Sequence, residues 1–113
     1  MFSRKAVAMQ LPEGLTATMQ GRTLVAMNAE RAIVAAPLGP IAKRRHIVHL
    51  AQVGHRTANV RFGEIEGLKC VLEGQAFYYL YVGGVCIQVT EELIPGSGAE
   101  SRVEEYLHTL EMK

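Results

Sequence analysis

The chain has 113 residues, of which 49% are hydrophobic and 20% charged, and its formal net charge is +1. This length supports one domain with a modest core, and the composition is typical of an ordered globular protein rather than a disordered one. No apolar stretch approaches the roughly 20 residues of a membrane-spanning helix, and the N-terminal residues lack the pattern of a signal peptide, so we expect a single cytoplasmic domain, residues 1–113, with no membrane partner.

The first 27 residues have the pattern of short strands. Residues 5–11 can form a first strand, which the turn residues Pro12, Glu13 and Gly14 would end. Residues 15–20 and 23–27 contain side chains typical of strands and flank Gly21. This segment therefore predicts a hairpin after the first strand.

The segment that follows Asn28 allows two interpretations. Residues 29–36 are rich in helix formers, and Asn28 is a good helix cap. The same segment contains Ile33 and Val34, which favour a strand. The sequence leaves this choice open, and it predicts a break of either element over residues 37–40, which read Pro-Leu-Gly-Pro.

Residues 40–54 favour a helix, because proline suits the first helical position and glycine the position after the last. On a helical wheel the apolar side holds Ile41, Ile47, Val48, Leu50 and Ala51. The polar side holds Arg45, His49 and Gln52 with His46 beside them, while Lys43 and Arg44 interrupt the apolar side. The alternative is a strand over residues 46–52.

The longest signal in the sequence runs from residue 68 to 90 and contains both cysteines and three of the four tyrosines. Gly83-Gly84 predicts a tight hairpin turn, because such turns need positive φ angles. The turn would pair Val82 with Val85, Leu80 with Ile87 and Tyr78 with Val89 on one face of the sheet. The other face would carry Phe77, Tyr79 and Tyr81.

Further strands extend this hairpin into an antiparallel meander. A turn at Gly74-Gln75 would add residues 68–73, with Leu68, Cys70 and Leu72 on the aromatic face, whereas a three-residue loop would reverse that facing. Residues 57–62 form another predicted strand, followed by a turn region over residues 63–67.

The two cysteines lie on the strands that flank a shared central strand in this arrangement. Two strand spacings would separate Cys70 from Cys86 by roughly 9–10 Å, which is too far for a disulfide. We therefore predict buried, free thiols in a reducing compartment.

The C-terminal segment predicts an amphipathic helix after a linker at residues 95–98. Ser97 with Glu100 and Ser101 with Glu104 both match a capping box. The helix would present the apolar stripe Val103, Tyr106, Leu107 and Leu110 to the sheet or to a partner. The expected fold is a single α+β domain with a mainly antiparallel sheet, one mid-chain helix and this C-terminal helix.

Charge is segregated along the chain. Residues 1–63 carry nine lysines or arginines and two glutamates, a net of +7, whereas residues 64–113 carry three and nine, a net of −6. The basic segment would contact phosphates or an acidic partner through Lys43, Arg44, Arg45, His49, Arg56 and Arg61. It could instead dock onto the acidic half of the same protein, or remain solvated. A helix–turn–helix from residues 29–36 and 40–53 is weakly indicated, because prolines interrupt it.

Catalytic chemistry has little support in the sequence. His46, His49 and His55 have a spacing reminiscent of metal ligands, but no C-x-x-C pair or metalloprotease glutamate accompanies them. No glycine-rich phosphate loop is present, and a cysteine nucleophile would need exposure. We predict no enzyme activity, no cofactor and no metal.

The aromatic face of the hairpin could stack nucleic-acid bases, but we expect it to pack under the C-terminal helix with Tyr106 and Leu110. A hairpin that is apolar on both faces is hard to cover in a short chain. The sequence therefore favours a small non-enzymatic binding or regulatory protein that self-associates through Tyr79, Tyr81, Val103, Tyr106, Leu107 and Leu110. The alternative is a nucleic-acid-binding protein that uses residues 43–61, and a metal-dependent enzyme ranks third.

Overall fold

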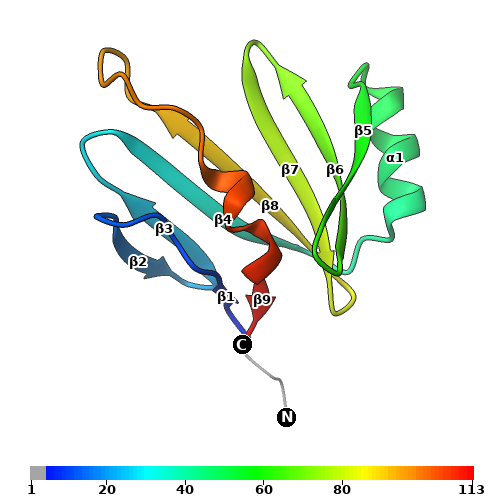
Figure 1. The fold of residues 1–113 in the computed structure, drawn as a ribbon. Helices are drawn as coiled ribbons and strands as arrows, with labels where there is room; N and C mark the ends of the chain where they lie inside the picture. Colours follow the sequence, from blue (N-terminus) through cyan, green and yellow to red (C-terminus); the bar gives the residue numbers. More distant parts are fainter. Residues whose placement is uncertain (1–4) are drawn as a thin grey trace.

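Seven strands form one antiparallel sheet in the order β2-β3-β4-β8-β7-β6-β5, as seen in a computed structural model that describes residues 5–113 (Figure 1). The bounds of the strands are β2 Thr16–Gln20, β3 Thr23–Met27, β4 Arg31–Gly39, β5 Thr57–Phe62, β6 Ile65–Leu72, β7 Gln75–Val82 and β8 Val85–Leu93. Helix α1 spans Lys43–Gln52. Short strands β1, Val7–Ala8, and β9, Glu111–Met112, pair with each other as a separate two-stranded sheet.

The predicted hairpins are present with the predicted facing. Strands β7 and β8 pair Tyr78 with Val89 and Leu80 with Ile87 across Gly83-Gly84, and β2 pairs with β3 around Gly21. The turn between β6 and β7 lies at residues 73–74, one residue earlier than predicted, because Leu72 pairs with Gln75. The aromatic face still receives Leu68, Cys70 and Leu72.

The turn after β5 is shorter than the predicted turn region of residues 63–67. It contains two residues, and β6 begins at Ile65, so Gly67 lies inside the strand opposite Leu80. A Cβ atom on residue 67 would lie 2.4 Å from Leu80 Cδ2 and 2.5 Å from the Tyr79 carbonyl oxygen. This glycine therefore permits a close approach of β6 to β7 rather than a turn.

Residues 31–39 form a strand, which settles the choice that the sequence left open after Asn28. The Asn28 side-chain oxygen accepts hydrogen bonds from the backbone N–H groups of Glu30 (2.8 Å) and Arg31 (3.0 Å), so it closes a turn rather than capping a helix. The helix–turn–helix hypothesis is wrong for the same reason. A two-helix motif needs a helix where the structure has β4.

The predicted break over residues 37–40 falls at the end of that range, since β4 continues through Pro37 and ends at Gly39. Pro37 is tolerated because the pairing of β4 with β3 ends at Ala35, and the pairing with β8 has an irregular register between Pro37 and Gly39. A proline without a partner strand on one side and next to a bulge removes no essential ladder hydrogen bond.

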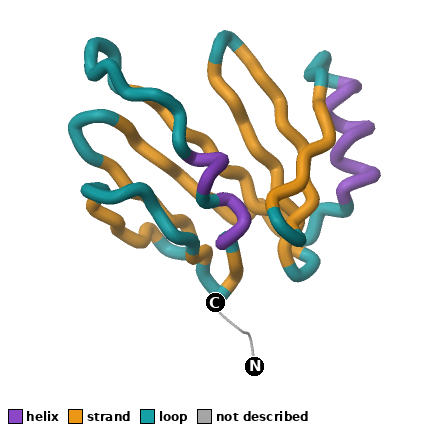
Figure 2. Tube along the Cα trace, viewed as in Figure 1, coloured by secondary structure: helices purple, strands orange, loops and turns teal. Residues whose placement is uncertain are grey.

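The C-terminal helix predicted by the capping boxes does not form. Residues 101–113 instead contain two single-turn 3-10 helices, Val103–Glu105 and Leu107–Thr109, followed by β9 (Figure 2). The Ser101 hydroxyl donates to Glu91 on β8 (2.6 Å) instead of capping a helix. The chain end is drawn into pairing with β1, where Ala6 and Lys113 exchange backbone hydrogen bonds. The predicted first strand shrinks to the two residues of β1 in this pairing.

Figure 1 shows the C-terminal segment, coloured orange to red, crossing one face of the sheet. This face forms the larger of two cores, and its buried members are Val7, Leu24, Ile33, Ala35, Tyr78, Leu80, Ile87, Val89, Val103, Leu107 and Leu110. The apolar stripe of the predicted helix therefore does pack on the sheet, although its backbone is not α-helical.

Helix α1 covers part of the opposite face and forms the second core. Leu50 packs there with Leu68, Cys70, Tyr79 and Cys86, and the partly buried side chains around them are Ile41, Ile47, Leu72, Phe77 and Tyr81. The expectation that the aromatic face packs under the C-terminal segment is therefore wrong. The basic helix covers this face instead. Side chains alternate along β7, so Tyr79 lies on the face covered by α1 and Tyr78 lies on the face covered by the C-terminal segment.

Candidate functional site

Helix α1 and the sheet enclose an open groove of about 540 Å³. Its lining residues come from α1, from the loop before it and from strands β4, β7 and β8: Leu38, Ile41, Arg45, His46, His49, Leu50, Tyr79 and Gln88. Arg45 and His49 are one helical turn apart on α1, so their side chains are neighbours on the same rim. Four of the lining side chains are apolar or aromatic, without counting the histidines, and none is a carboxylate.

His46 forms the centre of a buried polar cluster at this groove. Its Nδ1 lies 2.7 Å from the Tyr81 hydroxyl and 3.7 Å from Cys86 Sγ, and its ring meets Tyr79 edge-on at 4.6 Å between centroids. Burial, and to a smaller extent the nearby His49, lower the pKa of His46 below 6.5. The neutral ring can accept a hydrogen bond from Tyr81.

The sequence placed His46 on the polar side of the helix, which is wrong. The buried or half-buried positions of α1 are Lys43, His46, Ile47 and Leu50. They follow helical periodicity, but two of the four are polar residues, so hydropathy alone could not identify this face. The polar side chains of Tyr81 and Cys86 on the facing strands were a usable signal that His46 is buried, because a buried histidine needs a polar partner.

The two cysteines are free and buried, as predicted, on the strands that flank β7. Burial raises the pKa of Cys86 to about 11, and the nearby Tyr81 hydroxyl offsets only part of that effect. Cys86 is therefore protonated near neutral pH and has the character of a core residue rather than of a nucleophile, even with His46 beside it.

The predicted basic contacts lie mostly on the outer surface of α1 and the neighbouring β5. Arg44, Arg45 and His49 are exposed on the helix, Arg56 and Arg61 are exposed at β5, and Lys43 is half-buried. Arg61 pairs with Glu66 at 3.4 Å. Within residues 5–113 the cations Lys43, Arg44, Arg45 and Arg56 form no ion pair. Among the described residues, the cations of the basic segment therefore pair with the acidic half only through that exposed contact, although α1 packs on β6, β7 and β8 through apolar side chains.

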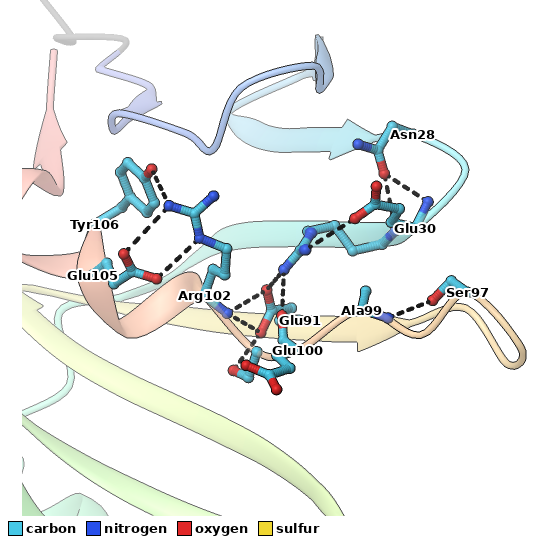
Figure 3. Close-up of polar contacts among 11 residues, drawn as sticks. Asn28, Glu30, Glu91, Ser97, Ala99, Glu100, Arg102, Glu105 and Tyr106 are labelled. Atoms are coloured by element: carbon cyan, nitrogen blue, oxygen red, sulfur yellow. Dashed lines mark hydrogen bonds and ion pairs between the residues drawn. The ribbon is translucent and has the colours of Figure 1, made fainter.

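The strongest contact between the basic and acidic halves lies elsewhere and is structural. Arg31 on β4 donates to Glu91 on β8 at 3.0 Å, and their side chains are only 6% and 4% exposed (Figure 3). Arg31 also donates to the Glu100 carbonyl oxygen (2.8 Å), and Glu91 accepts from Ser101 and from the Arg102 backbone N–H. This cluster fastens the C-terminal segment to the sheet.

The residues predicted to form a self-association interface are mostly internal. Tyr79, Val103, Leu107 and Leu110 are buried within the chain's own two cores, and Tyr81 and Tyr106 are half-buried. The hairpin that looked hard to cover is covered on both faces, by α1 and by the C-terminal segment. Those residues do not form an exposed apolar surface.

The two edges of the large sheet differ in their protection. Strand β5 carries Arg61, follows Arg56 and contacts α1. Strand β2, with the sequence Thr-Ala-Thr-Met-Gln, is uncharged, pairs with β3 without a bulge, and exposes all five residues. No described segment pairs with its outer side. Proteins usually protect such edges with charge, proline or a bulge.

The spacing of His46, His49 and His55, which is reminiscent of metal ligands, does not correspond to a ligand group among residues 5–113. In the part of the chain from residue 5 to 113, no three histidine, cysteine or glutamate side chains are grouped so that they could hold an ion. The same residues include no helix that is both long and apolar enough to cross a bilayer. Comparison of the chain with protein-family models, with curated proteins and with solved structures finds no match.

Proposed function

We propose that this chain is a small non-enzymatic binding protein that self-associates, and that strand β2 is the contact. The observation that carries this proposal is the open, uncharged edge of the seven-stranded sheet. The proposal keeps the self-association expected from the sequence but moves it away from the C-terminal segment and the central hairpin, which are occupied by intramolecular packing.

Strand β2 is complementary to a second copy of itself. An antiparallel pair with a two-fold axis at Thr18 would oppose Thr16 with Gln20, Ala17 with Met19, and Thr18 with its own copy. Threonine pairs across strands are favourable, and no like charges meet. The turn between β2 and β3 contains two residues, so the backbone N–H and C=O groups of Thr16, Thr18 and Gln20 point towards β3. Those of Ala17 and Met19 point to the open side, where a second copy could bind them.

Such pairing would join two sheets into one, with both α1 helices on the same face. This follows because a two-fold axis between antiparallel edge strands is perpendicular to the sheet. Two basic surfaces on one face would bind an extended polyanion with greater avidity than one surface alone.

Replacing Thr18 by Lys tests the contact directly. The substitution places two like charges opposite each other on the two-fold axis, so sedimentation equilibrium over a wide concentration range should show a dimer for the natural sequence and a monomer for Thr18→Lys. Thr18 is exposed, and its only side-chain hydrogen bond is a long one of 3.4 Å to Val25, so the monomer should fold normally.

Asn59→Lys is the matched control, because Asn59 is an exposed residue of the other edge strand, β5, and lies opposite the uncharged Leu68. This variant should remain dimeric. A strict monomer at high concentration for the natural sequence, or a dimer that survives Thr18→Lys, would contradict the proposal.

Nucleic-acid binding is the second candidate, and the unpaired cations of α1, together with Arg56 just before β5, favour it. Charges that no carboxylate neutralises within residues 5–113 are available for phosphate contacts. The double variant Arg44→Ala/Arg45→Ala should weaken binding to single- or double-stranded oligonucleotides, and the affinity of the natural sequence should fall steeply with salt. Arg102→Ala is the control, since Arg102 is paired with Glu105 at 3.1 Å. No binding at low salt would end this candidate.

A further inference from the structure

We propose that the groove beside α1 binds a small amphipathic carboxylate, with its anionic group at Arg45 and His49 and its apolar body against Leu38, Ile41, Leu50 and Tyr79. This site is separate from the proposed β2 contact, because β3 lies between that edge strand and β4, the nearest strand of the groove wall. The inference therefore does not depend on self-association.

The size and lining of the groove match those of ligand sites. Its volume of about 540 Å³ lies within the roughly 300–1,000 Å³ that is typical of small-molecule sites, which are mostly apolar with a few convergent polar groups. Here Arg45 and His49 supply donors at the α1 rim, and Gln88 on β8 supplies an amide at the sheet. Leu50 and Tyr79, only 5% and 8% exposed, form a firm apolar floor.

The charge of the lining selects an anion. Arg45 is exposed and has no carboxylate partner within residues 5–113, and the lining contains no acidic side chain. A guanidinium presents paired donors that match a carboxylate. A cationic ligand would meet only like charge at this rim.

The floor is held in place before any ligand arrives. His46 lies at 2.7 Å from the Tyr81 hydroxyl and packs edge-on against Tyr79, so it fixes α1 relative to β7. A preorganised site loses little conformational entropy on binding. The buried histidine, only 6% exposed, thus positions the groove.

Three ten-carbon probes with different head groups test this assignment: decanoate, decanol and decyltrimethylammonium, each below its micelle-forming range. Backbone amide shifts in NMR titrations should show saturable binding of decanoate with changes at residues 38, 45, 49 and 88. Decanol should bind more weakly and the cation weakest. Equal binding of the three probes, or changes confined to another region, would overturn the proposal.

Neighbouring arginines on α1 provide a matched pair of variants. Arg45→Ala should reduce decanoate affinity by about tenfold, the loss expected when one charged hydrogen-bonded contact is removed. Arg44→Ala should leave the affinity unchanged, because Arg44 is exposed on the same helix but does not line the groove. Equal losses in both variants would indicate a diffuse charge effect and contradict a built site.

The Thr18→Lys variant separates this proposal from self-association. Its decanoate affinity should equal that of the natural sequence, whether or not the natural sequence forms a dimer. Loss of decanoate binding in Thr18→Lys would place the ligand at the β2 contact instead of the groove and would overturn the assignment.

Discussion

His46 shows how one residue can couple the stability of this fold to pH. Burial lowers its pKa below the ordinary 6.5, so the folded chain resists a proton that the unfolded chain accepts. Above pH 6.5 both states hold a neutral ring, and His46 adds no pH dependence. As the pH falls below 6.5, the unfolded state is favoured until the folded-state pKa is reached.

The free energy of unfolding should therefore decrease on acidification from pH 7.5 towards pH 5. One proton sets an upper limit of about 1.4 kcal/mol per pH unit. Urea denaturation at a series of pH values should show a flatter dependence for His46→Gln, whose amide can still accept from Tyr81. The exposed His108→Gln serves as control and should keep the natural slope. An unchanged slope in His46→Gln would contradict this account.

At the scale of elements, the C-terminal segment is fastened rather than self-supporting. Its two 3-10 turns are too short to be stable alone. Polar contacts hold this segment at two points. Glu91 accepts a hydrogen bond from Ser101 at its start, and Lys69 (2.8 Å) and Tyr78 donate to Glu104 further along. These hydrogen bonds, with that of Lys69 the most important, lower the pKa of Glu104. The segment's conformation is therefore determined by the sheet beneath it.

Glu91→Gln should strongly destabilise the attachment of the C-terminal segment to the sheet. The substitution preserves size but removes the buried carboxylate partner of the Arg31 guanidinium, which keeps only the exposed Glu30 at 3.4 Å as an anionic partner. Breaking one side of a buried pair costs about 3–5 kcal/mol, which urea denaturation can measure. The exposed pair Arg61–Glu66 gives the contrast, since Arg61→Ala should change the free energy of unfolding by less than about 1 kcal/mol. Similar losses in both variants would show that Arg31 and Glu91 are solvated in solution.

At the scale of the whole molecule, the sheet needs both covering layers. The C-terminal segment inserts Leu107, which is fully buried, into the core that also holds Val7 from the other end of the chain. Neither cover can form a core alone, because each is a short segment. Contacts between residues distant in sequence therefore complete the domain.

Leu107→Ala should destabilise the whole fold by about 2–5 kcal/mol, the range for truncating a buried leucine. Leu38→Ala is the matched control, because Leu38 is 42% exposed, and its effect on thermal unfolding should be small. If the two variants had the same melting temperature, Leu107 would not be packed in the core between the C-terminal segment and the sheet.

Local patterns predicted the hairpins well, and the reason is physical. A glycine pair between β-rich runs restricts the turn, and the alternation of side chains then determines which residues share a face. The pairing of Tyr78 with Val89 follows from that rule alone. The rule also places Leu68 on the same face as Tyr79, but it does not give their pairing, because the turn lies at residues 73–74 rather than 74–75. A helix was predicted over residues 40–53 for a similar reason, since proline and glycine bound that segment, and α1 spans the shorter range Lys43–Gln52.

The same local reasoning failed for the C-terminal segment, and it left residues 29–36 undecided between helix and strand. Both have helix-forming composition, but Ser101 and Asn28 make hydrogen bonds to groups outside a helix. Long-range pairing of β4 with β8 and of β1 with β9 outweighs a helix propensity of a few tenths of a kcal/mol per residue. No single-segment pattern contains the information about those partners.

The candidate site was predictable only in part. The basic residues of 43–61 were identified from charge alone, whereas the groove and the open β2 edge depend on strand order. The sequence by itself determined the hairpins, the facing of their side chains, the mid-chain helix and the segregation of charge, because these depend on neighbours along the chain. Only the tertiary structure decided which layer covers each face, that His46 is buried, and that the C-terminal segment is not an α-helix. Those outcomes depend on contacts between β1, β4, β8, α1 and the chain end, which are brought together by folding.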